Sequence, residues 1–236
     1  STIIGHVGID ETNRRFFVSD HGKLKIFAYD LDSVLTTPEY QPSVKIDMKK
    51  KLFPDDYLYL NDTLCIAKII EPIGNNDYKP SVARWNMATE EINPMPYEYP
   101  DLKKVRFIYA ASAEHQLYVQ CYTQYDLMTI CDFNGNLKCN IYGPKWVNEK
   151  TQTQHYSLGV EFCGDKILAL YSGGDHRTDA YYPTKFLVFD LNGNYLKTLE
   201  TGYMITDFCY DKENNRLIIN LNDEIQFAYL DLEGII

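Results

Sequence analysis

The sequence lacks the features that would place it in a membrane or on a polyanion. No apolar run approaches the roughly 20 residues that cross a bilayer, so we expect no transmembrane segment. Lys and Arg number only 23 against 33 Asp and Glu, which leaves a net charge of −10. That excess repels phosphate backbones and anionic headgroups. We therefore expect no nucleic-acid partner and no direct binding to a lipid surface.

Signatures of catalysis and of cofactor binding are also missing. The six cysteines include no Cys-x-x-Cys pair, and the five histidines form no His-x-His or His-Glu-x-x-His motif. Gly-x-Ser-x-Gly, Walker and Gly-x-Gly-x-x-Gly motifs do not occur. The sequence therefore predicts no metal, no cofactor and no catalytic residue. Most cysteines lie in apolar, strand-like runs, where we expect them to act as small hydrophobes.

Helical periodicity is scarce, whereas residues that favour strands are abundant. No long stretch places apolar residues at i, i+3, i+4 and i+7 between capping residues. Tyr occurs 20 times and Phe 11 times, beside only two Trp. Aromatic residues of this kind favour strands. The composition predicts an all-β protein.

A repeated motif organises these strands. "TICDFNGNLKCNI" at 129–141 closely matches "LVFDLNGNYLKTL" at 187–199, and Asp190 lies 58 residues after Asp132. Asp231 follows 41 residues later, Asp30 has the same context, and Trp85–Asn86 mark a degenerate copy. Five units at such spacing indicate a repeat architecture.

Each unit reads as a four-stranded antiparallel sheet. Two strand-like runs separated by turn residues precede each motif, as in "HVGIDETNRRFFVSD" and "SLGVEFCGDKILALYSG". Asn-Gly at 134–135 and 192–193 predicts a type I′ turn between the third and fourth strands. The Asp-x-Asn-x-Asn pattern is also compatible with calcium, but it lacks the Gly and Glu spacing of an EF-hand loop, which favours the hairpin.

Repeated sheets of this size pack most often as blades of a β-propeller. We predict one propeller domain over residues 1–236, with a fourth strand for the first blade within 36–54. The last unit stops after three strands, whereas "STIIG" precedes the first. Two readings follow: "STIIG" completes the last blade, or a further N-terminal blade lies outside the sequence.

The stretch from "YSGGDHRTDAYYPTKFLVFDLNGNYLKTLETG" to "ITDFCYDKENNRLIINL", with "VGIDETNRRFFVSDHGKLKIFAYDLDSVL" upstream, resembles the TolB-like six-bladed β-propeller family. Members are secreted or lipid-anchored proteins of gram-negative gut bacteria. The resemblance implies a periplasmic or cell-surface location, although no export signal is present in the sequence. Five units are visible where the family has six. The family supplies no catalytic residues.

Candidate ligand-binding residues lie in loops between second and third strands, where binding residues often occur on rigid scaffolds. "GGDHRTDAYY" at 173–182 is the longest such loop. The candidate set is Asp20, His21, Tyr122, Tyr125, Asp175, His176, Arg177 and Tyr181. Ionisable and aromatic groups of this kind suit a glycan, peptide or protein partner.

Two functions are compatible with this pattern. The favoured one is a non-catalytic binding or scaffold propeller. The alternative is a propeller glycoside hydrolase or lyase that uses two carboxylates at the central channel, drawn from Asp20, Asp126, Asp175 and Asp207. That alternative rests on fold analogy alone.

Overall fold

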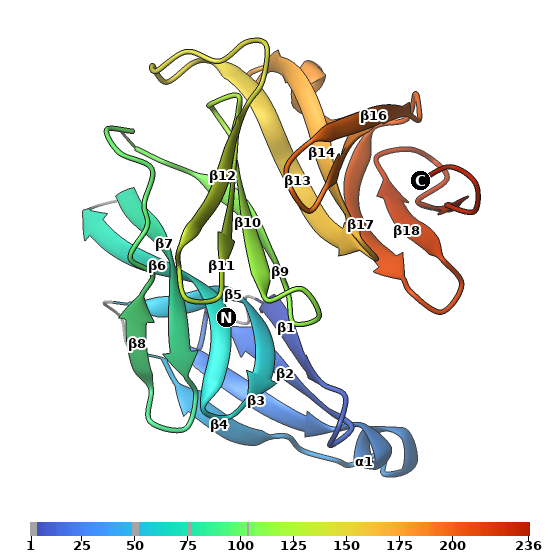
Figure 1. The fold of residues 1–236 in the computed structure, drawn as a ribbon. Coiled ribbons are helices and arrows are strands. Elements are labelled where there is room, and N and C mark those ends of the chain that lie inside the picture. Colours follow the sequence, from blue (N-terminus) through green and yellow to red (C-terminus); the bar gives the residue numbers. More distant parts are fainter. Residues whose placement is uncertain (1–3, 49–51, 75–76, 103) are drawn as a thin grey trace. The chain divides into compact units, whose positions relative to one another are not determined.

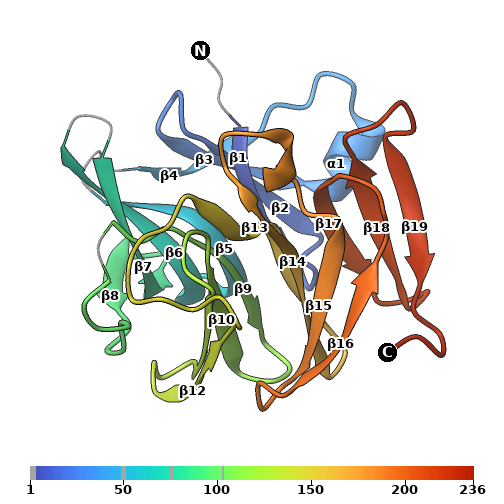
Figure 2. The same ribbon diagram turned by 90° about the horizontal axis from the view of Figure 1, so that it is seen from above.

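The computed structural model describes residues 4–48, 52–74, 77–102 and 104–236. The chain falls into two compact units, which are described separately: Ser1–Glu98 is unit 1 and Tyr99–Ile236 is unit 2. The described strands form five antiparallel sheets, four with four strands and one with three (Figures 1 and 2). The fold class is all-β, with the sheet arrangement of a five-bladed β-propeller. That the whole chain forms one domain stays a prediction.

Unit 1 contains the first two sheets. Their strands are β1 (Ile4–Asp10), β2 (Arg15–Asp20), β3 (Lys25–Asp30) and β4 (Ser43–Asp47), then β5 (Phe53–Asn61), β6 (Leu64–Gly74), β7 (Asp77–Asn86) and β8 (Glu91–Pro94). β4 supplies the fourth strand that the sequence predicts within 36–54. A short helix, α1 (Leu31–Thr36), was not predicted; it begins where the Asp30 carboxylate accepts a 2.7 Å hydrogen bond from the Ser33 amide.

The start of β1 corrects one reading of the N-terminus. Ile4 pairs with Asp20 of β2, and the same ladder continues to Asp10 opposite Arg15. Ile4 and Gly5 therefore belong to the first sheet and are not a spare strand for the last one. Residues 1–3 of the "STIIG" segment lie outside the described residues, as does the basic run at 49–51.

The core of unit 1 lies between its two sheets. Phe17 and Ile26 of the first sheet pack in one cluster with Tyr57 and Trp85 of the second. Trp85 is 1% exposed, and the Tyr57 ring meets it edge to face at 5.3 Å between ring centroids. Burial of large aromatic rings contributes much of the stability of such a core.

Unit 2 contains the other three sheets. They comprise β9 (Phe107–Ser112), β10 (Leu117–Tyr122), β11 (Leu127–Asp132) and β12 (Leu137–Tyr142); β13 (Thr153–Cys163), β14 (Lys166–Asp175), β15 (Lys185–Asp190) and β16 (Tyr195–Glu200); and β17 (Ile205–Asp211), β18 (Arg216–Leu221) and β19 (Phe227–Asp231). A 3₁₀ turn, η1 (Asp179–Tyr181), lies between β14 and β15. No helix in the described part of the chain is long and apolar enough to cross a membrane.

The two Asn-Gly motifs do form the predicted hairpins, but with a different turn. A type I′ turn needs positive φ at both central residues. Gly135 (φ 79°) and Gly193 (φ 85°) have it, whereas the asparagines before them do not. Gly135 N–H donates to the Asp132 carbonyl, and the ladder shifts register at this end. This is the pattern of a three-residue loop closed by a glycine bulge.

The aspartate of the motif fixes this turn. Its Oδ1 accepts from the amides of Asn134 (2.8 Å) and Asn136 (2.9 Å), and Asp190 repeats the same two bonds in the next sheet. At Asp132 burial acts to raise the pKa of the carboxyl group, but hydrogen bonds from the Asn136 side chain and the turn amides together lower it. At Asp190 the bond from the Asn194 side chain is the main cause of the lowered pKa. The oxygens therefore serve the turn, as the hairpin reading predicts.

The cysteines are free and mostly buried. Cys65, Cys121, Cys131 and Cys163 lie in the cores, where burial raises the pKa of each thiol. They therefore act as small hydrophobes, as predicted. Cys139 is half-buried, and Cys209 is exposed on β17.

Candidate functional site

Three connections of unit 2 meet and are held together by hydrogen bonds. They are residues 123–126 between β10 and β11, residues 143–152 between β12 and β13, and residues 173–182, which run from the end of β14 through η1. The sequence predicted a loop over all of 173–182, but residues 173–175 continue β14 and pair with β13, so the connection itself starts at His176. We call these three segments the loop platform. Gln124 Nε2 donates to the Thr151 carbonyl at 3.2 Å, and the Thr151 hydroxyl donates to the Gln124 carbonyl at 3.2 Å. His176 N–H donates to the Gln152 carbonyl at 3.1 Å.

A buried polar cluster lies at the base of the loop platform. Asp126 and His155 are each 1% exposed, and the Tyr171 side chain is beside them. Asp126 Oδ2 accepts from the Lys145 amide at 2.9 Å. His155 Nδ1 lies 3.3 Å from the Tyr171 hydroxyl and 3.7 Å from Asp126 Oδ1, the latter too far for a direct hydrogen bond.

The electrostatics of this cluster follow from its burial. Burial lowers the pKa of His155, and the negative charge of Asp126 opposes that shift only in part. Burial, followed by the Asp126 charge, raises the pKa of the Tyr171 hydroxyl. At neutral pH His155 is therefore a neutral ring and Tyr171 a neutral phenol. Such a cluster positions the surrounding backbone without exposing a charge.

The pH dependence of stability provides a test of this burial. Because the pKa of His155 in the folded state lies below the unfolded value of about 6.5, the unfolded chain takes up the proton first on acidification. Stability is expected to fall as the pH drops from 6.5 towards the folded pKa. The His155→Gln variant should lose this part of the slope. Urea unfolding at several pH values measures it, and an identical slope in both proteins would contradict the assignment.

Gly143 allows the cluster to form. A Cβ at this position would lie 2.1 Å from Asp126 Oδ1, because the carboxylate occupies that space. Gly143 N–H also donates to the Asp126 carbonyl at 2.8 Å. This role could not be inferred from the sequence, because Gly143 lies 17 residues from Asp126 along the chain.

The 173–182 loop is folded against itself. The Arg177 guanidinium binds both oxygens of Asp175, with Nη2 at 2.6 Å from Oδ2 and Nε at 3.0 Å from Oδ1. This pairing lowers the pKa of the Asp175 carboxyl group. His176 Nδ1 lies 2.9 Å from the Gln152 carbonyl, and the rings of Tyr181 and Tyr182 lie 4.2 Å apart. His176 and Arg177 are exposed on this loop.

The two candidate tyrosines of this region are buried: Tyr122 ends β10, where the sequence predicted a loop, and Tyr125 lies in the 123–126 segment. Tyr122 and Tyr125 are each 3% exposed. Tyr122 packs edge to face with Phe107, and the Tyr125 ring lies 6.3 Å from that of Trp146. Their proposed contact with a ligand stays a prediction, and in this structure the rings are part of the core.

An aromatic cluster beside the loop platform was missed by sequence reasoning. The rings of Tyr142 and Trp146 lie 5.1 Å apart, and Tyr99 lies 5.8 Å from Trp146. The Tyr99 and Tyr142 hydroxyls are 3.3 Å apart. Tyr142 is 50% exposed, so this cluster offers aromatic surface to solvent. The signal available in the sequence was Trp146, one of two tryptophans, in the segment between two repeats.

Asp20 and His21 belong to unit 1, so they are described apart from the loop platform. Asp20 is 2% exposed, and its Oδ1 accepts from the Lys23 amide at 3.0 Å. His21 is half-buried, with Phe53 edge to face at 5.5 Å between centroids. A Cβ on Gly5 would lie 2.8 Å from the His21 ring. Both side chains are packed into the fold of unit 1.

The four acids of the hydrolase alternative lie in different settings. Asp20 is in unit 1, Asp126 is buried in the polar cluster, and Asp207 is exposed on β17. Asp175 is paired with Arg177, which lowers its pKa, whereas a general acid needs a raised one. Among the described residues, no three His, Cys, Asp or Glu side chains gather in a metal-binding group. The absence of a metal stays a prediction.

Comparison with known proteins identifies the fold and no family. No protein-family model matches the sequence, and no curated protein matches it. The fold is similar to the extracellular domain of a putative one-component system from B. thetaiotaomicron, with TM-score 0.61 and 11% identity, over 98% of this chain and 28% of that one.

Two further solved structures share the fold. A chain of the nidogen/laminin complex has TM-score 0.60 and 11% identity, over 99% of this chain and 77% of that one. The extracellular domain of a putative hybrid two-component system from B. thetaiotaomicron has TM-score 0.59 and 10% identity, over 97% of this chain and 27% of that one. This chain thus spans about a quarter of the two bacterial proteins. At such identities the likeness shows the β-propeller fold alone.

Proposed function

We propose that this chain is a non-catalytic binding domain of an exported protein, which presents the loop platform to a protein, peptide or glycan partner. The observation that carries the proposal is the set of hydrogen bonds that joins the three segments, from Gln124–Thr151 to Gln152–His176. Loops fixed in this way hold His176, Arg177 and the aromatic cluster in place before a partner arrives. Such preorganisation reduces the entropic cost of binding.

The structural neighbours are compatible with this role. Two are extracellular domains of a putative one-component and a putative hybrid two-component system, and the third comes from the nidogen/laminin complex. A periplasmic or cell-surface location fits the bacterial neighbours and the resemblance to the TolB-like propellers. The excess of acidic residues favours partners that are neutral or basic over polyanions.

The test begins with a search for ligands by glycan array and by display of a peptide library against the whole chain. Replacement of Arg177 with alanine is then expected to weaken the captured ligand about ten-fold or more, because Arg anchors often dominate such interfaces. Arg177 is an exposed side chain, so the fold should be retained.

Arg14→Ala is a matched control, because Arg14 forms a similar exposed pair with Asp32 at 2.7 Å but lies in unit 1. It should leave the affinity unchanged. Equal affinity of wild type, Arg177→Ala and a Tyr142→Ala/Trp146→Ala double variant for the captured ligand would remove the loop platform from consideration.

A further inference from the structure

The last sheet of unit 2 has three strands among the described residues. The described strands of this sheet are β17, β18 and β19 in that order, whereas every other described sheet has four (Figure 2). In an antiparallel ladder, alternate residues direct their N–H and C=O groups to opposite sides. The Leu221 N–H donates to the Gln226 carbonyl, and the Leu232 N–H donates to the Asn215 carbonyl. The main-chain N–H and C=O groups of the even-numbered residues from 226 to 232 therefore point towards β18. The main-chain groups of Phe227, Tyr229 and Asp231 therefore face the open edge.

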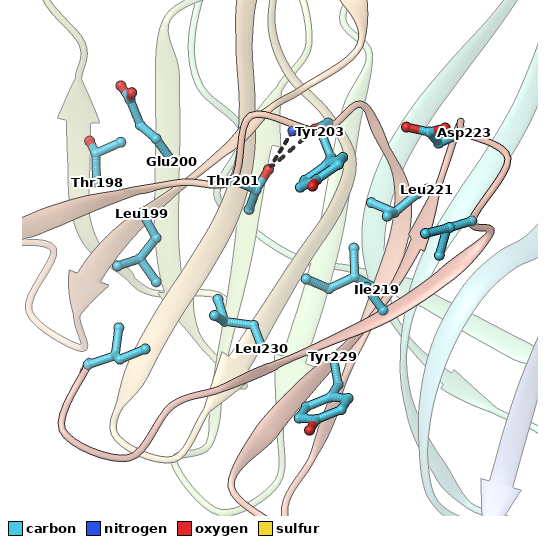
Figure 3. Close-up of a pocket in the computed structure, with 13 residues that line it drawn as sticks. Thr198, Leu199, Glu200, Thr201, Tyr203, Ile219, Leu221, Asp223, Tyr229 and Leu230 are labelled. Carbon is cyan, nitrogen blue, oxygen red and sulfur yellow. Dashed lines mark hydrogen bonds between the residues drawn. The ribbon is translucent and has the colours of Figure 1, made fainter.

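An apolar groove adjoins this edge. It has a volume of about 630 Å³ and lies between β16 and the sheet of β18 and β19. Leu199 points into it from β16, and Ile219, Leu221 and Leu230 line it from the other side (Figure 3). The Thr201 hydroxyl and the main chain of Tyr203 hydrogen-bond to each other at its margin.

The four-stranded sheets β9–β12 and β13–β16 are neighbours, and they show how the outer strand of one sheet packs against the next sheet. There the fourth strand β12 packs its Cys139 and Ile141 side chains into a core shared with the β13–β16 sheet. These two side chains lie within 3.0 Å of where a Cβ on Gly193, in the β15–β16 turn, would be. The outer strand of one sheet is thus covered by the outer hairpin of the next. In the β17–β19 sheet, Leu199 of β16 packs against Ile219 and Leu221, but the described strands end at β19, so no outer hairpin occupies the corresponding place.

The unpaired edge of β19 is also unusually apolar for an exposed strand edge. Ile225, Phe227 and Tyr229 are 70%, 66% and 67% exposed. Exposed edge strands are normally protected by charge, proline or a covering segment, because their free main-chain groups pair readily with another strand. Ile4–Asp10 of the chain's own N-terminal region is already paired as β1.

The charges around the groove select the partner. Glu200 and Asp223 line it, Asp231 ends β19, and Glu224 and Glu233 flank the strand. The nearby cations are already engaged: Lys197 donates to the Ile235 carbonyl, and Arg216 binds Asp211 at 2.8 Å. A second copy of this chain would bring the same acids to the edge, so like charges oppose self-pairing.

We propose that the β19 edge is a second binding surface, which accepts an extended segment of another protein as the fourth strand of this sheet. The segment runs antiparallel to β19 and bonds to the main-chain groups of Phe227, Tyr229 and Asp231. Its aliphatic side chains at every second position fill the groove over Leu199, and Lys or Arg at its ends face the acidic margin. Main-chain bonds supply affinity and the groove supplies selectivity in this mode of recognition. The surface is distinct from the loop platform.

The probe is a synthetic eight-residue peptide with valine at alternate positions, threonine between them and lysine at both ends. Calorimetry should show that it binds the whole chain about ten-fold or more tightly than the same peptide with glutamate ends. Amide hydrogen exchange at Phe227, Tyr229 and Asp231 should slow about ten-fold or more on binding. A peptide with N-methylated main-chain groups on its pairing edge should not bind.

Charge-reversal variants complete the test. Glu200→Lys/Asp223→Lys should invert the preference towards the glutamate-ended peptide, whereas Glu11→Lys/Glu39→Lys, at exposed acids of unit 1, should keep the preference for lysine. Failure of both peptides to bind, or equal binding, would overturn the proposal. Protection of the three amides in the free, monomeric protein would show that its own chain covers the edge. A concentration-dependent dimer with the same protection would assign the edge to a second copy. Either of these last results would also overturn it.

Discussion

The Gly143→Ala variant is expected to lose about 1–3 kcal/mol of unfolding free energy, because the added methyl group meets a carboxylate that cannot easily move. The Cβ would lie 2.2 Å from both Cγ and Oδ2 of Asp126, which is 1% exposed and bonded to the Lys145 amide. Displacing Asp126 breaks that bond, which is one of those that hold the 143–152 segment of the loop platform in place. Urea denaturation followed by far-UV circular dichroism measures the loss.

A double-mutant cycle identifies the cause. Asp126→Ala alone should also destabilise, since it leaves the Lys145 amide without its acceptor. The Gly143→Ala/Asp126→Ala variant should cost less than the two single changes together, because the clash has no partner once the carboxylate is gone. Gly74→Ala is the control: no atom lies within 4 Å of its Cβ position, so its effect should stay within about 0.5 kcal/mol. Additive costs in the cycle would contradict the steric explanation.

The Trp85→Ala variant is expected to lose about 3–5 kcal/mol, which is the largest effect anticipated for a single change in this chain. Trp85 fills the space between the two sheets of unit 1 and is 1% exposed. Its removal leaves a cavity beside Tyr57, Cys65 and Ala83, which the surrounding strands are too well paired to close.

Trp85→Phe should recover a large part of this loss, because it restores an aromatic contact with Tyr57. The measurement is again urea denaturation by circular dichroism. With Trp85 absent, the only remaining tryptophan is Trp146 of unit 2, whose fluorescence reports the state of the loop platform. A loss below about 1 kcal/mol for Trp85→Ala would show that this ring does not carry the core.

Much of the fold is determined locally, and so it can be inferred from residue patterns. The similarity between segments 129–141 and 187–199 reflects a repeated turn. In each copy the aspartate, Asp132 or Asp190, accepts a hydrogen bond from the main-chain amide two residues later. Each hairpin follows from alternating apolar residues and turn residues nearby. The turn type escaped inference because a glycine at positive φ is common to type I′ turns and to glycine bulges. α1 escaped it because six residues with one capping aspartate give too short a periodic signal.

The candidate site was only partly accessible in this way. The 173–182 loop could be recognised by its length and composition, but its partners could not. That His176 meets Gln152, or that Asp126 occupies the space above Gly143, depends on contacts between segments 17–24 residues apart. The candidate residues Tyr122 and Tyr125 are each 3% exposed, and a polar loop sequence does not reveal which side chains turn inward.

The sequence by itself determined the all-β class, the five-fold repeat and the acidic surface, because strand alternation, turn chemistry and charge are properties of neighbouring residues. The tertiary structure decided which loops of unit 2 come together, and which acid is buried and which is paired. Those features arise only when side chains from different sheets compete for the same space and the same hydrogen-bond partners.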